Sequence, residues 1–68
     1  MFTVDADKLR TLMLKRGIFG AYELAKLARL NAATTAKALK DGAKVTIKTL
    51  GALAILFGVD VNDLILKG

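Results

Sequence analysis

Apolar residues recur along the chain at the spacing of amphipathic α-helices, in segments that end at glycine or at polar turn residues. The first segment predicts a helix over about 5–16, with Asp5 as its N-cap and Gly17 as its stop. Three residues form its apolar stripe: Leu9, Leu12 and Met13. Ahead of this helix, Phe2 and Val4 alternate with polar residues and predict a short extended arm.

The middle of the chain predicts two short helices joined by a tight turn, over about 21–28 and 32–40. Phe19 and Leu24 occupy the two positions of a hydrophobic staple at the start of the first helix. Asn31 is suited to cap the second helix. The residues expected to face inward are Leu24, Ala25, Leu27 and Ala28 on the first helix and Thr35, Ala38 and Leu39 on the second.

Two further helices are predicted over about 47–57 and 61–66, with Thr46 and Asp60 as their N-caps. The residues expected to face inward on the first are Ile47, Leu50, Leu53, Ala54 and Phe57, and those expected outward are Gly51, Ala52, Ile55 and Leu56. Together the five short helices predict one all-α domain over 1–68, because a chain this short holds a single core.

The composition excludes several kinds of site. The chain has no Cys and no His, so it lacks disulfides, thiolate metal sites and the usual proton shuttle at neutral pH. No glycine-rich phosphate loop, metal-ligand cluster or nucleophile–base pair occurs in the sequence. We therefore expect no enzymatic activity and no bound metal or cofactor. The hydrophobic fraction of 54% indicates that some apolar surface meets a partner.

The formal net charge of +5 favours an anionic partner such as nucleic acid. The alternative is a mildly basic domain whose lysines are simply solvated. The N-terminus has no long apolar run, and the most apolar stretch, 50–59, is about half the roughly 20 residues that span a bilayer. We therefore expect a core helix at this stretch, no membrane partner and a cytoplasmic location.

Several short motifs follow one another in a characteristic order. They are the pair Leu24-Ala25, the turn Leu30-Asn31, the pair Ala38-Leu39, the run Thr49-Leu50-x-x-Leu53-Ala54 and the closing segment GVDVNDLI at 58–65. Together they cover nearly the whole chain and resemble the phage-repressor and Cro-type (Xre-like) helix-turn-helix family. The resemblance implies a five-helix, lambda-repressor-like domain that binds double-stranded DNA in a regulatory role. Helix 32–40 would enter the major groove, and the start of helix 21–28 would meet the phosphate backbone.

The resemblance also implies roles for individual residues. Bases would be read from Ala32, Ala33, Thr34 and Lys37, and phosphates would be contacted from Ala21, Tyr22, Lys40 and Lys44, with Lys48 as a further basic residue nearby. Ala32 and Ala33 can touch only thymine methyl groups, so Thr34 and Lys37 are the polar candidates for direct readout. For the lysines, the alternative is a solvated helix face. Arg29 departs from the family, which usually has glycine in this turn.

The outward side of helix 47–57 carries the second candidate surface. Ile55 and Leu56, with Leu66 nearby in sequence, would form an apolar patch. Either the last helix folds over this patch, or a second copy or another protein covers it. The first hypothesis is therefore a DNA-binding transcriptional regulator that acts as a homodimer on a palindromic site. The second is a protein-interaction module, such as an antirepressor or a modulator of a larger regulatory protein, that uses the apolar patch.

Overall fold

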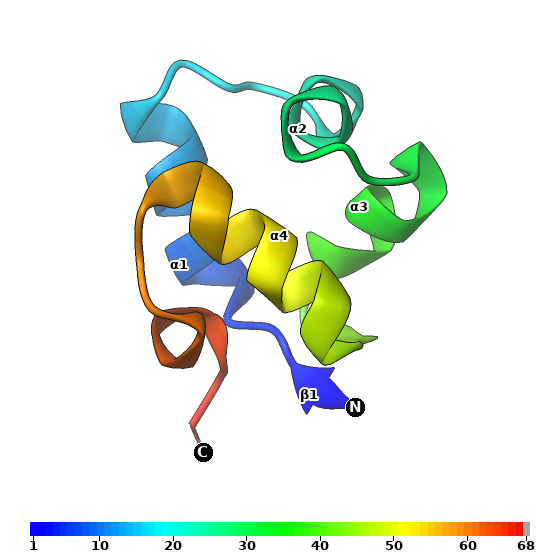
Figure 1. Ribbon diagram of the computed structural model, residues 1–68, viewed down its shortest axis with the longest axis vertical. Coiled ribbons are helices and arrows are strands. Elements are labelled where there is room, and N and C mark those ends of the chain that lie inside the picture. Colours follow the sequence, from blue (N-terminus) through cyan, green and yellow to red (C-terminus); the bar gives the residue numbers. More distant parts are fainter. Residues whose placement is uncertain (68) are drawn as a thin grey trace.

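Four α-helices and one short 3-10 helix surround the core in the computed structural model, which describes residues 1–67. The helices are α1 (Ala6–Lys15), α2 (Ala21–Ala28), α3 (Ala32–Ala38), α4 (Ile47–Phe57) and η1 (Val61–Leu64). Figure 1 shows α4 crossing in front of α1, with α2 and α3 on one side of it and η1 on the other. The predicted all-α helix-turn-helix fold is thereby confirmed.

The N-termini of these helices follow the capping residues in the sequence. Asp5 accepts from the Lys8 N–H at 3.1 Å, and Asn31 Oδ1 accepts from the N–H groups of Ala33 and Thr34 at 2.8 and 3.3 Å. Thr46 caps α4, and Asp60 with Asp63 forms a reciprocal capping box on η1. These side chains satisfy backbone donors that a helix cannot pair internally, and the predicted N-caps are confirmed.

Three helices end in the same left-handed turn. The residues with positive φ at these ends are Gly17 (70°), Arg29 (58°) and Gly58 (66°). After α2, the Leu30 N–H donates to the Ala25 carbonyl at 2.8 Å, and the Arg29 N–H donates to the Lys26 carbonyl at 3.4 Å. The ends of α1 and α4 have the same two backbone hydrogen bonds. Arg29 is the one residue other than glycine with positive φ among residues 1–67.

Two helix boundaries differ from the predictions. Helix 32–40 is shorter, because α3 ends at Ala38. The α-helix predicted over 61–66 is wrong, because the segment makes one 3-10 turn and then becomes extended at Ile65. The physical reason is tertiary hydrogen bonding: Leu64 accepts from the Asp5 N–H at 2.8 Å, and the Leu66 N–H donates to Thr3 at 2.9 Å. The tail therefore pairs with the N-terminal arm.

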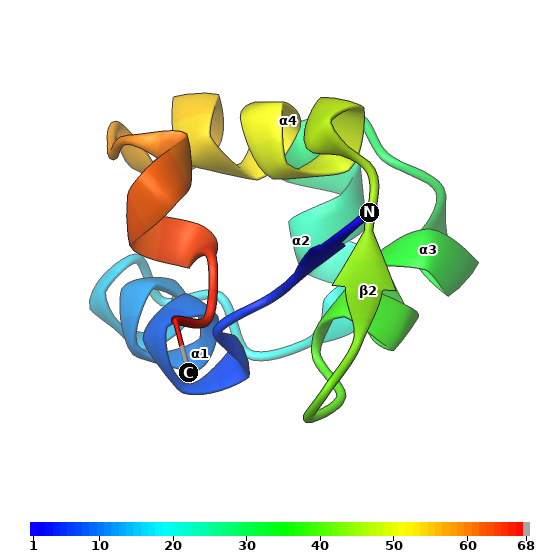
Figure 2. The same cartoon turned by 90° about the horizontal axis from the view of Figure 1, so that it is seen from below.

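A small antiparallel sheet joins the N-terminal arm to the segment before α4. It consists of β1 (Phe2–Thr3) and β2 (Lys44–Val45), with Phe2 opposite Val45. The extended arm was predicted correctly, whereas β2 was not among the predicted elements. Figure 2 shows β1 and β2 side by side near the start of α4, so the sheet brings the N-terminus towards α3.

The core is built mainly from leucines of α1, α2, α4 and η1. The large side chains that are completely buried include Leu9, Leu24, Leu50, Leu53 and Leu64.

Some side chains are not buried or exposed as predicted. Leu27 and Ile47 are each 53% exposed, and Leu56 is half-buried against the core instead of outward. Phe19 is 81% exposed, so the predicted staple with Leu24 is not formed. Ile18, at 3% exposed, belongs to the core instead.

Candidate nucleic-acid interface

Helix α3 is held against α2 by small and polar side chains. Ala25 on α2 and Ala38 on α3 are both buried, and their small size lets the two helices approach closely. Thr35 is also buried, and its Oγ1 donates to the Asn31 carbonyl at 2.9 Å. The hydrogen bonds of the preceding turn fix the angle at which α3 leaves α2. The outer face of α3 is therefore presented by a rigid support.

The far end of α3 is tied to α1 by Arg10. Its Nη1 donates to the Leu39 carbonyl at 2.7 Å, and its Nη2 donates to Asp7 at 2.8 Å and Asp41 at 3.0 Å. The hydrogen bonds to Asp7 and Asp41 raise the pKa of Arg10, so the guanidinium remains charged through the whole neutral range. Arg10 thus supplies a donor to a carbonyl that the helix itself leaves free.

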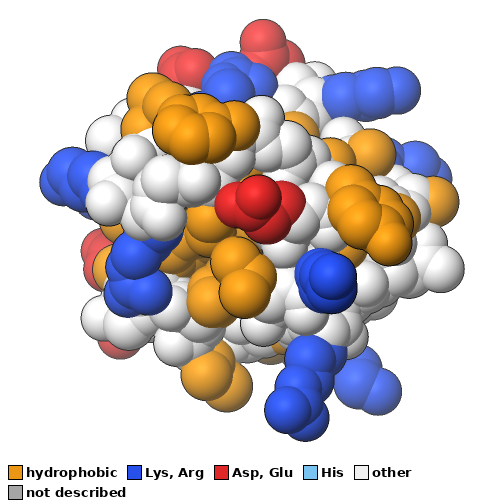
Figure 3. All heavy atoms as spheres, turned by 90° about the horizontal axis from the view of Figure 1, so that it is seen from above, with side chains coloured by type: hydrophobic (Ala, Val, Ile, Leu, Met, Phe, Trp, Pro, Cys, Tyr) orange, Lys and Arg blue, Asp and Glu red, His pale blue; other side chains and the backbone are white. Residues whose placement is uncertain are grey.

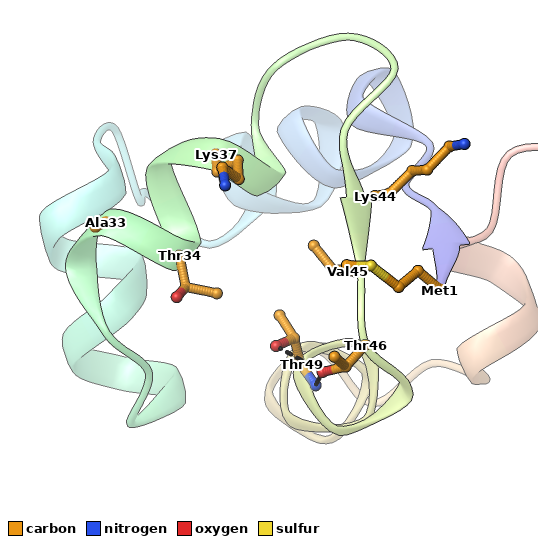
Figure 4. Close-up of a pocket in the computed structure, with 8 residues that line it drawn as sticks. All are labelled: Met1, Ala33, Thr34, Lys37, Lys44, Val45, Thr46 and Thr49. Carbon is orange, nitrogen blue, oxygen red and sulfur yellow. Dashed lines mark hydrogen bonds between the residues drawn. The ribbon is translucent and has the colours of Figure 1, made fainter.

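The exposed face of α3 carries the residues that were candidates for reading bases. Ala32, Ala33 and Lys37 are exposed, and Thr34 is half-exposed. Figure 4 shows Ala33, Thr34 and Lys37 along one side of α3, opposite β2 and the start of α4. Between these elements lies a hollow of about 280 Å³, lined by Met1, Ala33, Thr34, Lys37, Lys44, Val45, Thr46 and Thr49. The structure therefore brings four of the candidate residues, from α3 and β2, to one concave surface.

Positive charge is concentrated in the part of the sequence that contains this surface. Six of the eleven Lys and Arg residues lie between Lys26 and Lys48. The single acidic residue in that stretch, Asp41, is already bonded to Arg10. Within residues 1–67 both ion pairs involve Arg10, so the lysines of this surface make none. Their ammonium groups are free to meet an anion.

At the start of α2, the two predicted phosphate-contact residues lie in different surroundings. Tyr22 is 74% exposed and lines a shallow hollow with Lys26 and Ala32, next to the outer face of α3. Ala21 is half-buried and lines a separate apolar hollow with Leu14 and Phe19. The N-cap Gly20 has no side chain to bond the first N–H groups of α2. These backbone donors are therefore open to an external acceptor such as a phosphate.

The hollow beside α3 also includes residues that were not candidates in the sequence. Met1 reaches it because β1 pairs with β2, and Thr46 and Thr49 reach it from the first turn of α4. The pattern predicts the extended arm but not the segment with which it pairs, so the position of Met1 beside α3 could not be found from the sequence. Lys40 and Lys48 are exposed but do not line the hollow.

Of the apolar patch predicted around helix 47–57, the structure brings together Ile55 and Leu56 but not Leu66. Ile55 and Leu56 line a hollow with Leu27 of α2 and Ala52 of α4. Leu66 lies beside β1 instead, where its N–H donates to Thr3. Figure 2 shows this tail leading away from α4. Figure 3, which looks onto the side of α2, shows exposed hydrophobic side chains separated by charged ones.

A comparison with protein families gives one match. The model of the Cro/C1-type HTH DNA-binding domain matches residues 8–66, which span α1 to the extended tail. The chain belongs to the Cro/C1-type helix-turn-helix family. Comparisons with curated proteins and with solved structures give no significant match.

Membership of the Cro/C1-type family assigns DNA binding and transcription regulation to this domain. In DNA-binding helix-turn-helix motifs the second helix is the recognition helix. The helix at that position in this chain is α3. Within residues 1–67 no helix is long and apolar enough to cross a membrane. The same residues contain no group of three acidic, Cys or His side chains that could hold a metal ion.

Proposed function

We propose that this Cro/C1-type domain binds a palindromic duplex site as a homodimer, with α3 of each copy in the major groove. The observation that carries the proposal is that the outer face of α3 borders the hollow between α3, β2 and the start of α4. There exposed Ala33 and Lys37 stand next to Lys44, and no acidic side chain lines the hollow. An anionic, grooved partner fits this combination of shape and charge.

The side chains of α3 divide into two kinds of contact with bases. Ala32 and Ala33 meet thymine methyl groups through their own methyl groups, since they have no polar atoms. Thr34 and Lys37 supply the hydrogen bonds to base edges. Lys37 is a donor only, so it favours guanine acceptors. With two polar readers per copy, discrimination per half-site is modest, and the spacing between two half-sites adds to it.

The surrounding residues anchor the backbone of the DNA. Lys40, Lys44 and Lys48 neutralise phosphates around the groove, and Tyr22 donates from the edge of α2. Ala21 contributes through its backbone N–H at the uncapped start of α2, not through its side chain. Each neutralised phosphate steepens the dependence of log affinity on log salt by about 0.9 for duplex DNA.

The test is selection of binding sites from random duplex DNA at two salt concentrations. We expect an enriched palindrome whose two half-sites lie about one helical turn apart. The double variant Lys37→Glu, Lys40→Glu should abolish binding to the selected duplex. The matched control is Lys8→Glu, Lys15→Glu on α1, which changes the net charge equally but lies outside this face. Equal affinity of the two double variants would refute the proposed reading face.

A second function is supported by two observations, the bland Ala32–Ala33 pair and the exposed Ile55 on α4. In that case the domain is a protein-interaction module that modulates a larger regulator. Selection would then yield no enriched sequence at either salt concentration, and the Lys37 and Lys40 substitutions would leave its regulatory effect intact.

A further inference from the structure

Asp41 is the one acidic residue within 24–59, and it lies among the lysines proposed to meet DNA. Lys40 precedes it directly, Lys44 follows three positions later, and Lys37 lies four positions earlier. The side chain of Asp41 is 87% exposed. A carboxylate at this place is a ready partner for each of these ammonium groups, and it would compete there with a DNA phosphate.

The backbone around Asp41 folds into a tight turn between α3 and β2. The Ala43 N–H donates to the Lys40 carbonyl at 3.1 Å, which closes this turn. Figure 4 shows Lys37 on α3 and Lys44 on β2, on either side of the loop that joins these two elements. Lysines from both elements therefore flank the turn that carries the Asp41 carboxylate.

Among residues 1–67, Asp41 forms its ion pair with Arg10 of α1 and with none of these lysines. Its Oδ1 accepts from Arg10 Nη2 at 3.0 Å, and the same Nη2 donates to Asp7 at 2.8 Å. Arg10 Nη1 donates to the Leu39 carbonyl at 2.7 Å, two residues before Asp41. The planar guanidinium is thus fixed by three partners, and it holds the Asp41 carboxylate in one place.

We propose that Arg10 is a positioning residue for DNA binding, because it holds the Asp41 carboxylate against α1 and leaves the neighbouring lysines free for DNA. This role rests on the proposed function in one respect, the assignment of Lys40 and Lys44 to phosphates. Arg10 acts through Asp41 and not through a contact of its own with DNA. Without Arg10, Asp41 pairs with one of the lysines, and that lysine no longer neutralises a phosphate.

The two ion pairs of Arg10 matter more for DNA binding than for the stability of the fold. The side chains of Asp7 and Asp41 are 92% and 87% exposed, and that of Arg10 is 44% exposed. Water and salt screen such exposed pairs, so they stabilise a fold little. A phosphate contact contributes about 0.9 to the slope of log affinity against log salt, so its loss in about 0.1 M salt lowers affinity roughly eightfold.

A double-mutant cycle on DNA affinity tests this role. The probe is a short duplex of arbitrary sequence, because phosphate contacts carry no sequence information. Arg10→Met should bind it roughly eightfold more weakly in about 0.1 M salt, and the slope of log affinity against log salt should become shallower by about 0.9. Adding Asp41→Asn to Arg10→Met should restore both values to those of the parent protein. A purely structural Arg10 predicts no recovery, because Asp41→Asn restores none of the bonds of Arg10.

The matched control replaces the other carboxylate partner of Arg10. Arg10→Met with Asp7→Asn has the same net charge as Arg10→Met with Asp41→Asn, but Asp7 lies in the first turn of α1. This control should keep the weak binding and the shallow salt slope of Arg10→Met. Equal affinity of the two double variants would overturn the role of Arg10, because either no recovery occurs or net charge alone explains it.

Asp41→Asn alone provides a test that leaves the bond from Arg10 to Leu39 in place. A carboxylate that Arg10 already holds does not compete with phosphates, so its neutralisation should change affinity by no more than about twofold. Asp7→Asn should have the same small effect. A several-fold gain for Asp41→Asn that is absent from Asp7→Asn would mean that Asp41 competes with DNA in the parent protein, and it would overturn the role of Arg10.

A measurement without DNA separates failure of this role from failure of the proposed function. An ammonium group paired with a carboxylate loses its proton less readily, so it is acylated more slowly. With an amine-reactive reagent and mass spectrometry, at least one of Lys37, Lys40 and Lys44 should react several-fold more slowly in Arg10→Met than in the parent protein. Arg10→Met with Asp41→Asn should regain the parent rate. Unchanged rates for all three lysines in Arg10→Met would overturn the role of Arg10, even where Lys37→Glu, Lys40→Glu abolishes DNA binding.

Discussion

Replacement of Arg29 by glycine should stabilise the protein. Arg29 is the left-handed residue after α2, with φ 58° and ψ 43°, and its side chain is exposed. The two other helices that end in this turn use Gly17 and Gly58 at the equivalent position, with φ of 70° and 66°. An L-residue in this conformation costs roughly 1–2 kcal/mol because its Cβ crowds the neighbouring carbonyl. Glycine avoids that crowding.

The expected net gain is smaller than the strain that is removed. Glycine gives the unfolded chain more conformational freedom, which offsets about 0.4–1 kcal/mol of the gain. The free energy of unfolding should therefore rise by about 0.5–1 kcal/mol for Arg29→Gly. A gain of 1 kcal/mol corresponds to a Tm increase of about 4–8 °C in a domain of this size. The backbone hydrogen bonds of Arg29 and Leu30 should persist, because they use no side-chain atom.

Thermal unfolding followed by circular dichroism would measure this effect, with two controls. Arg29→Ala removes the same charge but keeps the Cβ, so its Tm should stay near that of the parent. Gly58→Ala makes the reverse change at a site where the new Cβ meets no atom within 4 Å, so it should destabilise through φ alone. The reasoning is refuted if Arg29→Gly and Arg29→Ala have the same Tm, because the strain assigned to Arg29 would then be absent.

Three further substitutions test the supports of α3 and the core by thermal and urea unfolding. Asn31→Ala removes the cap of α3 and should lower the free energy of unfolding by about 1 kcal/mol, whereas Asn31→Asp should retain most of it. Arg10→Met removes the tie to Leu39 and should lower the Tm slightly, with a larger effect at low salt. Because the pKa of Arg10 is raised, its contribution to the free energy of unfolding is present throughout the neutral range and is lost only in strongly alkaline solution. The decrease in Tm caused by Arg10→Met should therefore be the same in mildly acidic and mildly basic buffer. A difference between the two buffers would contradict this assignment. Leu64→Ala empties a fully buried position and should cost about 2–5 kcal/mol, and a loss below 1 kcal/mol would mean that η1 is not part of the core.

The proposed reading face has a functional consequence. With Thr34 and Lys37 as its polar readers, a single copy is expected to gain little from one half-site. The proposed homodimer would gain from both half-sites and from their spacing.

The helices and their caps could be predicted from the sequence because their signals are local. A cap such as Asn31 bonds N–H groups two and three residues away, so the residues that decide the start of α3 are all neighbours in the chain. The helix-turn-helix order could be predicted for the same reason. The exposed face of α3 then follows from the 3.6-residue period, once Thr35 and Ala38 are assigned to the core.

Only the tertiary structure decided the features that depend on distant partners. Whether Ile18 or Phe19 is buried depends on the direction in which the chain approaches Gly20, which the sequence pattern leaves open. The segment after η1 is extended because the N-terminal arm offers hydrogen bonds across more than sixty residues of chain. By the same pairing Met1 lies beside α3 and Leu66 lies away from Ile55. The sequence alone thus determined α3 and its exposed face, through contacts within one or two turns. The fold decided what surrounds it, because those contacts join residues that only folding brings together.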